Sequence, residues 1–130
     1  MNEPPRAAVL TPLAPGGIAV VSLVGSNAIE VLRRVFQPAR PTADWPADRL
    51  HFGRLIDGPQ VLDDAVVAVR TASDGTGCVE FNVHGGPRIV QRLLLALERE
   101  GAKIVSADEI APDAWAAVSA IERDVYTLLP

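Results

Sequence analysis

The stretch of residues 78–97 changes its hydrophobic period in the middle, and this change constrains the fold more than any other feature. Residues 78–84 alternate between polar and apolar side chains, a pattern typical of a strand with two unlike faces. After the turn at 85–87 the apolar residues recur at helical spacing, and Pro87 suits a first helical turn. One face of the strand carries Glu80, so this face cannot be ordinary core unless its polar groups have partners.

Shorter patterns along the chain predict the remaining strands. Residues 18–24 form a continuous aliphatic run, which is typical of a buried strand. Asp57-Gly58 is a hairpin signal between two strands. In addition to residues 78–84, the predicted strands are residues 7–10, 18–24, 50–56, 61–70 and 102–105.

Helical spacing predicts three helices. The first follows an N-cap at Ser26, has an apolar stripe that includes Phe36, and ends before the next proline. The second ends just before Gly101, a favourable residue beyond a helix end. The last runs to the C-terminus and begins either at a capping box from Ser106 or near Asp113.

Length and element order place these segments in one domain. A chain of 130 residues can bury one sufficient core. Three helices and five or six strands in mixed order predict an α+β domain with a single mixed sheet. We expect this domain to span residues 1–130, with flexible ends at residues 1–6 and 126–130.

The composition excludes several classes of function. A net charge of −4, a single lysine and 5% aromatic residues argue against direct nucleic-acid binding by electrostatics or base stacking. A single cysteine excludes an internal disulfide and fits a reducing compartment. The N-terminus has no signal-peptide pattern, and the longest apolar run is too short to span a bilayer. We expect a cytoplasmic protein that does not bind membranes.

Most residue types with catalytic potential have an ordinary structural explanation. The chain contains no glycine-rich loop ending in Gly-Lys-Ser or Gly-Lys-Thr, so it lacks the nucleotide-binding loop of nucleotide hydrolases. Cys78 and His84 share a strand face but lie about 20 Å apart, too far for a nucleophile and its base. No metal-ligand spacing is visible. Asp63-Asp64 and Arg33-Arg34 are interpreted as solvated or hydrogen-bonded surface residues.

The end of strand 78–84 is the most informative stretch for function. Glu80 and His84 share one strand face, and Gly85-Gly86 turns the chain into a helix N-terminus. Backbone N–H groups at a helix N-terminus suit a polar or anionic ligand, so these residues could form a small polar pocket. The alternative is that both side chains lie on a wet sheet face and the glycines only make the turn.

Several segments together resemble the N-terminal domain of the MnmE (TrmE) family of tRNA-modifying GTPases. Order and spacing agree from about residue 7 to residue 110. The most specific segment is His84-Gly85-Gly86-Pro87 after a Val-Glu-Phe strand. The other matching pieces are Thr11-Pro12, Gly16-Gly17-Ile18-Ala19-Val20-Val21, Gly25, His51-Phe52-Gly53-Arg54-Leu55, Leu62-Asp63-Asp64 and Thr76-Gly77.

The resemblance implies a tetrahydrofolate-binding type of domain that forms a homodimer. In the family, a formyl-tetrahydrofolate binds at or near the dimer interface and is thought to supply a one-carbon unit. The family works with a GTPase domain and a flavoprotein partner to modify the wobble uridine of certain tRNAs. We expect the dimer to bury apolar surface from the first strands of the sheet.

The family's ligand contacts carry over only in part. Its carboxylate contact corresponds to Glu80, and the pocket around it includes His84 and the two glycines that follow. The family's arginine corresponds to Ser22, and its lysine position falls near Ser119. A charge-assisted hydrogen bond contributes roughly 1.5–3 kcal/mol, so the loss of both cations would weaken binding by a hundredfold or more.

Two hypotheses follow from these matches and differences. The first is an accessory module that binds 5-formyl-tetrahydrofolate or a related pterin and acts with a separate GTPase and a flavoprotein. The second is a dimerisation module without folate binding. The sequence ends at Pro130, before the position of the family's GTPase domain, so we expect no enzyme activity from this chain alone. An independent folate-dependent enzyme has little support, because no acid–base or nucleophile pair is visible.

Overall fold

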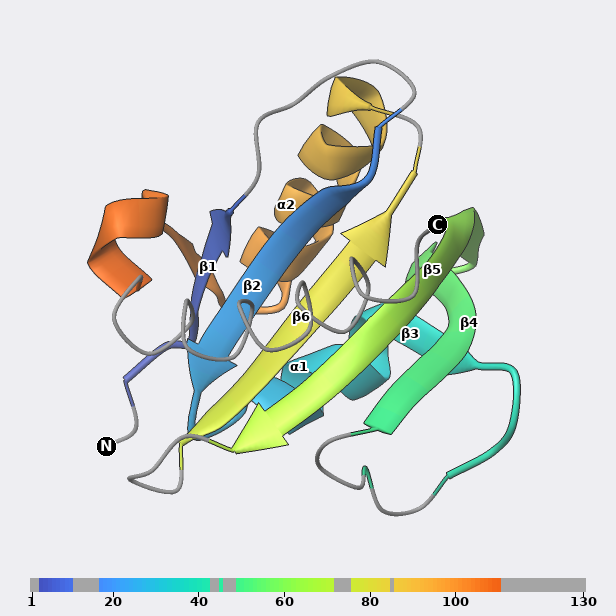
Figure 1. Ribbon diagram of the computed structural model, residues 1–130, viewed down its shortest axis with the longest axis horizontal. Coiled ribbons are helices and arrows are strands. Elements are labelled where there is room, and N and C mark those ends of the chain that lie inside the picture. The colour runs from blue at the N-terminus through green and yellow to red at the C-terminus, as the bar shows by residue number, and fades with distance from the viewer. Residues whose placement is uncertain are drawn as a thin grey trace, which may run out of the picture.

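Strand pairing organises the part of the chain that the computed structural model describes, residues 3–10, 17–42, 45, 49–71, 76–84 and 86–110. Seven strands in these residues form one mixed sheet in the order β3-β4-β5-β6-β2-β1-β7 (Figure 1). All neighbouring pairs are antiparallel except β1 with β7, which is parallel. The strands are β1 Arg6–Val9, β2 Ala19–Gly25, β3 Phe36–Pro38, β4 Arg49–Asp57, β5 Gln60–Thr71, β6 Gly77–Val83 and β7 Lys103–Ile104.

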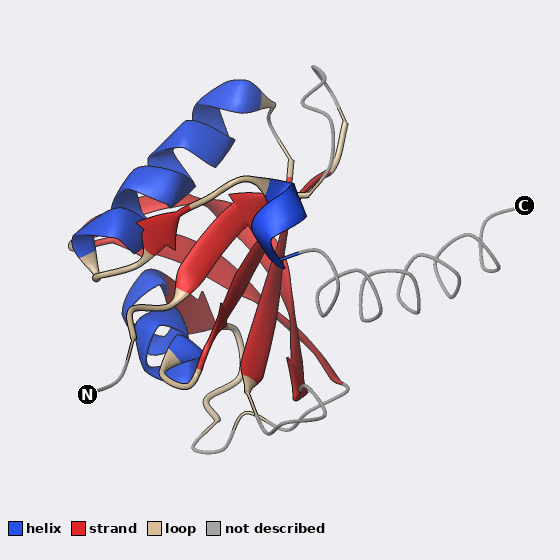
Figure 2. Cartoon of the chain, turned by 90° about the vertical axis from the view of Figure 1, so that its left-hand side faces the viewer, coloured by secondary structure: helices blue, strands red, loops and turns tan. Residues whose placement is uncertain are grey.

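Two helices cover one face of the sheet and close the main core. These helices are α1, Ala28–Val35, and α2, Pro87–Arg99, and both lie on the same side of the strands (Figure 2). Alternate residues of the central strands meet the apolar stripes of the helices, because successive strand residues point to opposite faces. The largest side chains fully buried in this core are Phe36, Phe81, Leu23, Leu32, Leu55, Leu93 and Leu97.

A smaller apolar cluster lies on the opposite face of the sheet. A short third helix at residues 107–110 approaches that face, away from α1 and α2 (Figure 2). Its Ile110 is buried among side chains of β1, β2 and β6. The cluster consists of Ala8, Leu10, Val20, Val24, Cys78 and Ile110. This face is therefore partly closed at the β1 side of the sheet.

The predicted fold class is confirmed: one α+β domain with a mixed sheet and three helices. The hairpin signal is also confirmed, because β4 ends at Asp57, β5 begins at Gln60, and Gly58 has a positive φ of 58°. Gly101 follows α2 with a φ of 100°, as expected of a glycine beyond a helix end. At the third helix the backbone N–H of Glu109 donates to the carbonyl of Ser106 at 3.1 Å. The predicted start near Asp113 lies outside the described residues.

Three details of the prediction are wrong, and all concern α1 or the strand after it. The sheet has seven strands in the described residues rather than five or six, because Phe36 begins β3. Phe36 has extended dihedral angles, φ −138° and ψ 130°, and so does not continue the helix. Pro38 disfavours the helical conformation at Gln37, directly after Phe36, so the helix cannot continue past this point. The N-cap is Asn27 rather than Ser26, and it makes no side-chain capping bond.

Candidate functional site

The sheet face away from α1 and α2, which we call the open face, can be laid out in rows from the strand register. Neighbouring strands lie about 4.8 Å apart, and successive residues on one face of a strand are about 6.6 Å apart. The central row contains Glu80, which pairs with Ser22 on β2 and with Ala68 on β5. The complete row, from β4 to β1, is Leu50, Ala68, Glu80, Ser22 and Ala8.

Two further rows follow toward the end of β6. The next one, from β4 to β2, is Phe52, Val66, Asn82 and Val20. In the row after it Arg54 pairs with Asp64, and the same register continued by one residue brings in His84 and Ile18. The open face therefore changes from a buried centre at Glu80 to a charged row at Arg54 and Asp64.

Glu80 and Ser22 form a cross-strand pair that is withdrawn from water. Glu80 is 1% exposed and Ser22 is 0% exposed. The Ser22 hydroxyl oxygen lies 3.7 Å from the Cys78 sulfur, one row further along β6. Burial excludes the interpretation in which Glu80 lies on a wet sheet face. Carboxylates in such surroundings cost free energy to maintain, and they are found preferentially at functional sites.

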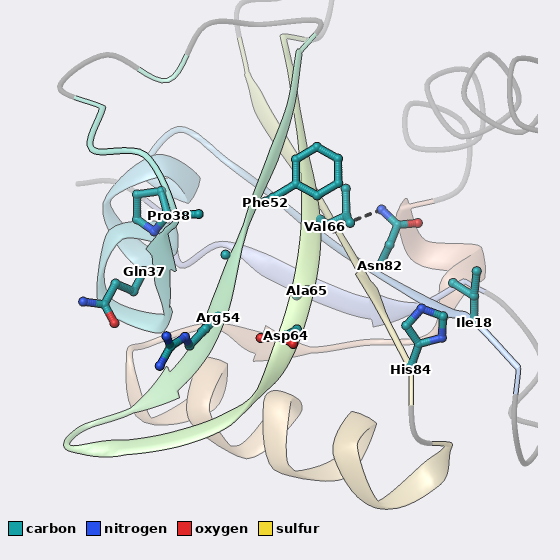
Figure 3. A pocket seen from close by; sticks show the side chains of 12 residues that line it. Ile18, Gln37, Pro38, Phe52, Arg54, Asp64, Ala65, Val66, Asn82 and His84 are labelled. Carbon is teal, nitrogen blue, oxygen red and sulfur yellow. Dashed lines mark hydrogen bonds between the residues drawn. The ribbon is translucent and has the colours of Figure 1, made fainter.

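A hollow of about 800 Å³ lies on the open face beside the Glu80 row (Figure 3). Gln37 and Pro38 lie on one side of it, and His84 and Ile18 lie on the other. Phe52 lies between these two sides on β4. This volume is within the range of small-molecule sites, which combine apolar walls with a few polar groups.

The polar groups of the hollow come from four strands, with Gln37 on β3 at its edge. The Asn82 side-chain N–H₂ donates to the carbonyl of Val66 at 3.3 Å, which fixes the orientation of the amide. Arg54 and Asp64 are cross-strand neighbours, yet neither side chain forms an ion pair or hydrogen bond with another residue that the structure describes. His84 is exposed at the far end of the same row. The hollow thus presents a cation, a carboxylate, two amides and an imidazole to solvent.

The structure brings together some of the predicted site residues and separates others. Glu80 and Ser22 are direct neighbours, whereas His84 lies about 13 Å further along the strand and lines the hollow. Gly86 is the N-cap of α2, with φ 74°, so its backbone conformation favours glycine. Gly85 and Ser119 lie outside the described residues.

Sequence reasoning did not single out Phe52, Arg54 or Asn82, which line the hollow. Asn82 could have been predicted as a site residue, because the alternation in residues 78–84 places it on the same face of β6 as Glu80. Phe52 and Arg54 lie in a segment that matches the family, but their position relative to β6 depends on how three strands pair.

Other chemical sites receive no support from the described residues. Cys78 is a buried thiol, outside any disulfide, on the strand that also carries Glu80. Within the described ranges no three His, Cys, Asp or Glu residues are grouped so that they could hold a metal ion. In the same ranges no helix is both long and apolar enough to cross a membrane.

Comparison with known proteins gives one consistent match. The family described as "GTP-binding protein TrmE N-terminus" matches residues 6–115. The chain is similar to proteins named "tRNA modification GTPase MnmE". The one from Chlorobium phaeobacteroides is 36% identical over 85% of the chain, and the one from Heliobacterium modesticaldum is 38% identical over 84% of the chain. A protein of the same name from Roseiflexus castenholzii is 36% identical over 88% of the chain. In all three comparisons the chain spans 25% of the length of the relative.

Proposed function

The chain belongs to the family of TrmE N-terminal domains, and from this premise we propose that it is a folate-binding, dimer-forming module of tRNA wobble-uridine modification. The ligand in this proposal is 5-formyl-tetrahydrofolate or a related reduced pterin. The module forms a homodimer and acts with a GTPase and a flavoprotein. The chain spans about a quarter of the length of its relatives, so the GTPase activity in their name is not assigned to these residues.

The buried carboxylate of Glu80 is the observation that carries the proposal. An ionised carboxylate accepts two parallel hydrogen bonds, one on each oxygen. The 2-amino-4-oxo edge of a pterin offers two adjacent N–H donors and so suits such an acceptor. Ser22 adds a hydroxyl beside Glu80, in the position that matches the family's arginine. Glu80 is the principal contact for the head of the ligand in this proposal, and because its side chain is 1% exposed, the groups that cover it must move aside when the ligand binds.

Exposed apolar side chains on the open face support the homodimer. Ile18, Leu50 and Phe52 are 57%, 53% and 63% exposed. All three lie in the rows that surround Glu80 and the hollow. Two copies related by a twofold axis present the same patch to each other, so these side chains would lie at the interface, beside the ligand.

Calorimetric titration with 5-formyl-tetrahydrofolate tests the ligand. We expect binding by the wild-type chain and loss of at least tenfold in affinity for Glu80→Gln, because the amide offers only one acceptor oxygen. Circular dichroism of the variant shows whether the fold is preserved. Equal affinity of the two proteins would contradict the assigned contact.

Sedimentation at tens of micromolar tests the dimer. We expect Phe52→Glu to shift the protein toward monomer, whereas Leu95→Glu leaves the dimer intact. Leu95 is the matched control because it is 54% exposed on α2, on the opposite layer of the domain. A wild-type monomer at these concentrations would contradict the homodimer.

A dimerisation module without folate binding is the second candidate. The observation that favours it is Ser22, since the central row contains no cation among the described residues. Without a cation beside Glu80, the ligand loses one charge-assisted contact of roughly 1.5–3 kcal/mol. No heat at millimolar ligand, together with a dimer in sedimentation, would establish this candidate instead of the first.

A further inference from the structure

We propose that the hollow on the open face holds the anionic tail of the ligand, with Arg54 as its counter-ion. This inference rests on the proposed function, because it places the head of the ligand against Glu80. A reduced folate has three parts in line, a bicyclic head, an aryl spacer and a glutamate tail. The open face offers a matching series, a buried carboxylate, an exposed aromatic ring and an arginine.

The spacing of these groups follows from the strand register. Glu80 and Arg54 are separated by two rows along the strands and by two strands across the sheet. With the usual strand dimensions, their Cα atoms lie about 16 Å apart. A ligand of head, aryl spacer and amino-acid tail in extended form has a length of that order. Its length therefore matches the separation of Glu80 and Arg54.

The row between Glu80 and Arg54 suits the aryl spacer. Phe52 lies in this row and is 63% exposed, so one side of its ring is open to a planar group. The Asn82 N–H₂ is held by the Val66 carbonyl, which leaves the amide oxygen as an acceptor directed away from β5 (Figure 3). An aromatic face and an oriented amide are typical of sites for an aryl group with polar substituents.

Arg54 is the cation of the hollow that suits a carboxylate. Its guanidinium forms no ion pair or hydrogen bond with any residue that the structure describes, and it projects toward Gln37 at the edge of the hollow (Figure 3). A guanidinium can bind one carboxylate through two parallel N–H groups. The glutamate tail of a folate supplies such a carboxylate. Arg54 thus takes part in ligand binding at a place remote from Ser22.

Asp64 limits how strongly the tail can bind. It is the cross-strand neighbour of Arg54, and its carboxylate repels a second anion placed beside it. Substitution of Asp64 by Asn should therefore increase the affinity for the tail. An increase in affinity for Asp64→Asn distinguishes tail binding from contact between two copies at this position. In the latter case Asp64 would pair with the partner's arginine, and removal of the Asp64 charge would weaken association.

The experiment compares two probes, 5-formyl-tetrahydrofolate and the tail-less 5-formyl-tetrahydropteroate, by calorimetric titration of the full chain. For the wild-type protein we expect the probe with the tail to bind about fivefold more tightly, the effect of one partly exposed ion pair. Arg54→Gln should remove this preference and leave the affinity for the tail-less probe unchanged. Asp64→Asn should increase the preference severalfold, and added salt should reduce it.

The control is Arg92→Gln, which neutralises an exposed arginine on α2, on the other layer of the domain. It should leave both affinities unchanged. If both probes bind equally and Glu80→Gln weakens both, the tail assignment is wrong and the proposed function stands. If neither probe binds at millimolar concentration, the tail assignment and the folate proposal are both wrong.

Discussion

The substitution Gly53→Ala is expected to displace the edge strand β3, which forms one side of the hollow. Gly53 pairs with Pro38 across β3 and β4. A Cβ atom at this position would overlap the carbonyl oxygen of Gln37, and it would lie 2.8 Å from Phe36 Cζ and 2.9 Å from Pro38 Cα. Two of these three atoms belong to the backbone of β3 and cannot rotate away. Relief of the overlap therefore requires the strand itself to move.

The free energy of unfolding should fall by about 2–3 kcal/mol, the upper part of the usual range for overpacking. Urea unfolding followed by circular dichroism measures this change. In a Trp115→Phe background, fluorescence reports on Trp45 alone, whose ring centroid lies 5.9 Å from that of Phe36. Displacement of β3 should change this signal in the native state, before the unfolding transition.

Gly58→Ala is the control for this prediction. Nothing lies within 4 Å of a Cβ at Gly58, but its φ of 58° is unfavourable for alanine. The control should therefore lose only about 1–2 kcal/mol through backbone strain, with no change in the fluorescence of Trp45. If Gly53→Ala loses less than about 1 kcal/mol and the fluorescence is unchanged, the reasoning from close packing is refuted.

Three further predictions test the core, the thiol and the absence of nucleotide chemistry. Leu93→Ala, at a 0% exposed position of α2, should destabilise the protein by about 2–5 kcal/mol in urea unfolding. Leu95→Ala, 54% exposed on the same helix, should cost about 0.5 kcal/mol or less, and similar losses would contradict the orientation of α2. Cys78 is 5% exposed, so a thiol reagent should label it rapidly in denaturant and slowly in the native protein, and fast native labelling would contradict its burial. The purified chain should not hydrolyse GTP, because its sequence lacks the phosphate-binding loop, and measurable turnover would overturn that inference.

Local patterns were sufficient to predict most of the elements. The alternation in residues 78–84 and the change to helical spacing after Pro87 correspond to β6 and α2. Two-residue turns and terminal glycines are local signals, so the hairpin at Asp57-Gly58 and the end of α2 before Gly101 were also predicted. These elements are correct because short-range backbone preferences and the hydrophobic period agree in them.

The errors occur where a tertiary contact overrides a local pattern. Phe36 continues the helical spacing of α1 in sequence, but its ring is buried as the first residue of β3, next to β4. The pairing of β3 with β4 brings together residues separated by a long connection. A helical stripe and an adjacent short strand can both bury the same phenylalanine, so the period alone does not decide between them.

The hollow depends on one irregularity that the sequence does not reveal. Counting back from the two-residue turn would pair Arg54 with Asp63 and would place Asp64 on the helix-covered face. In the structure the register shifts beside Leu62, and Arg54 pairs with Asp64 instead. Because residues 65–69 are all aliphatic, alternation in β5 does not indicate which of its side chains face the helices. The bulge determines this choice, since a shift by one residue exchanges the two faces of a strand. It is thus the bulge that places Asp64, rather than Asp63, beside Arg54 on the open face.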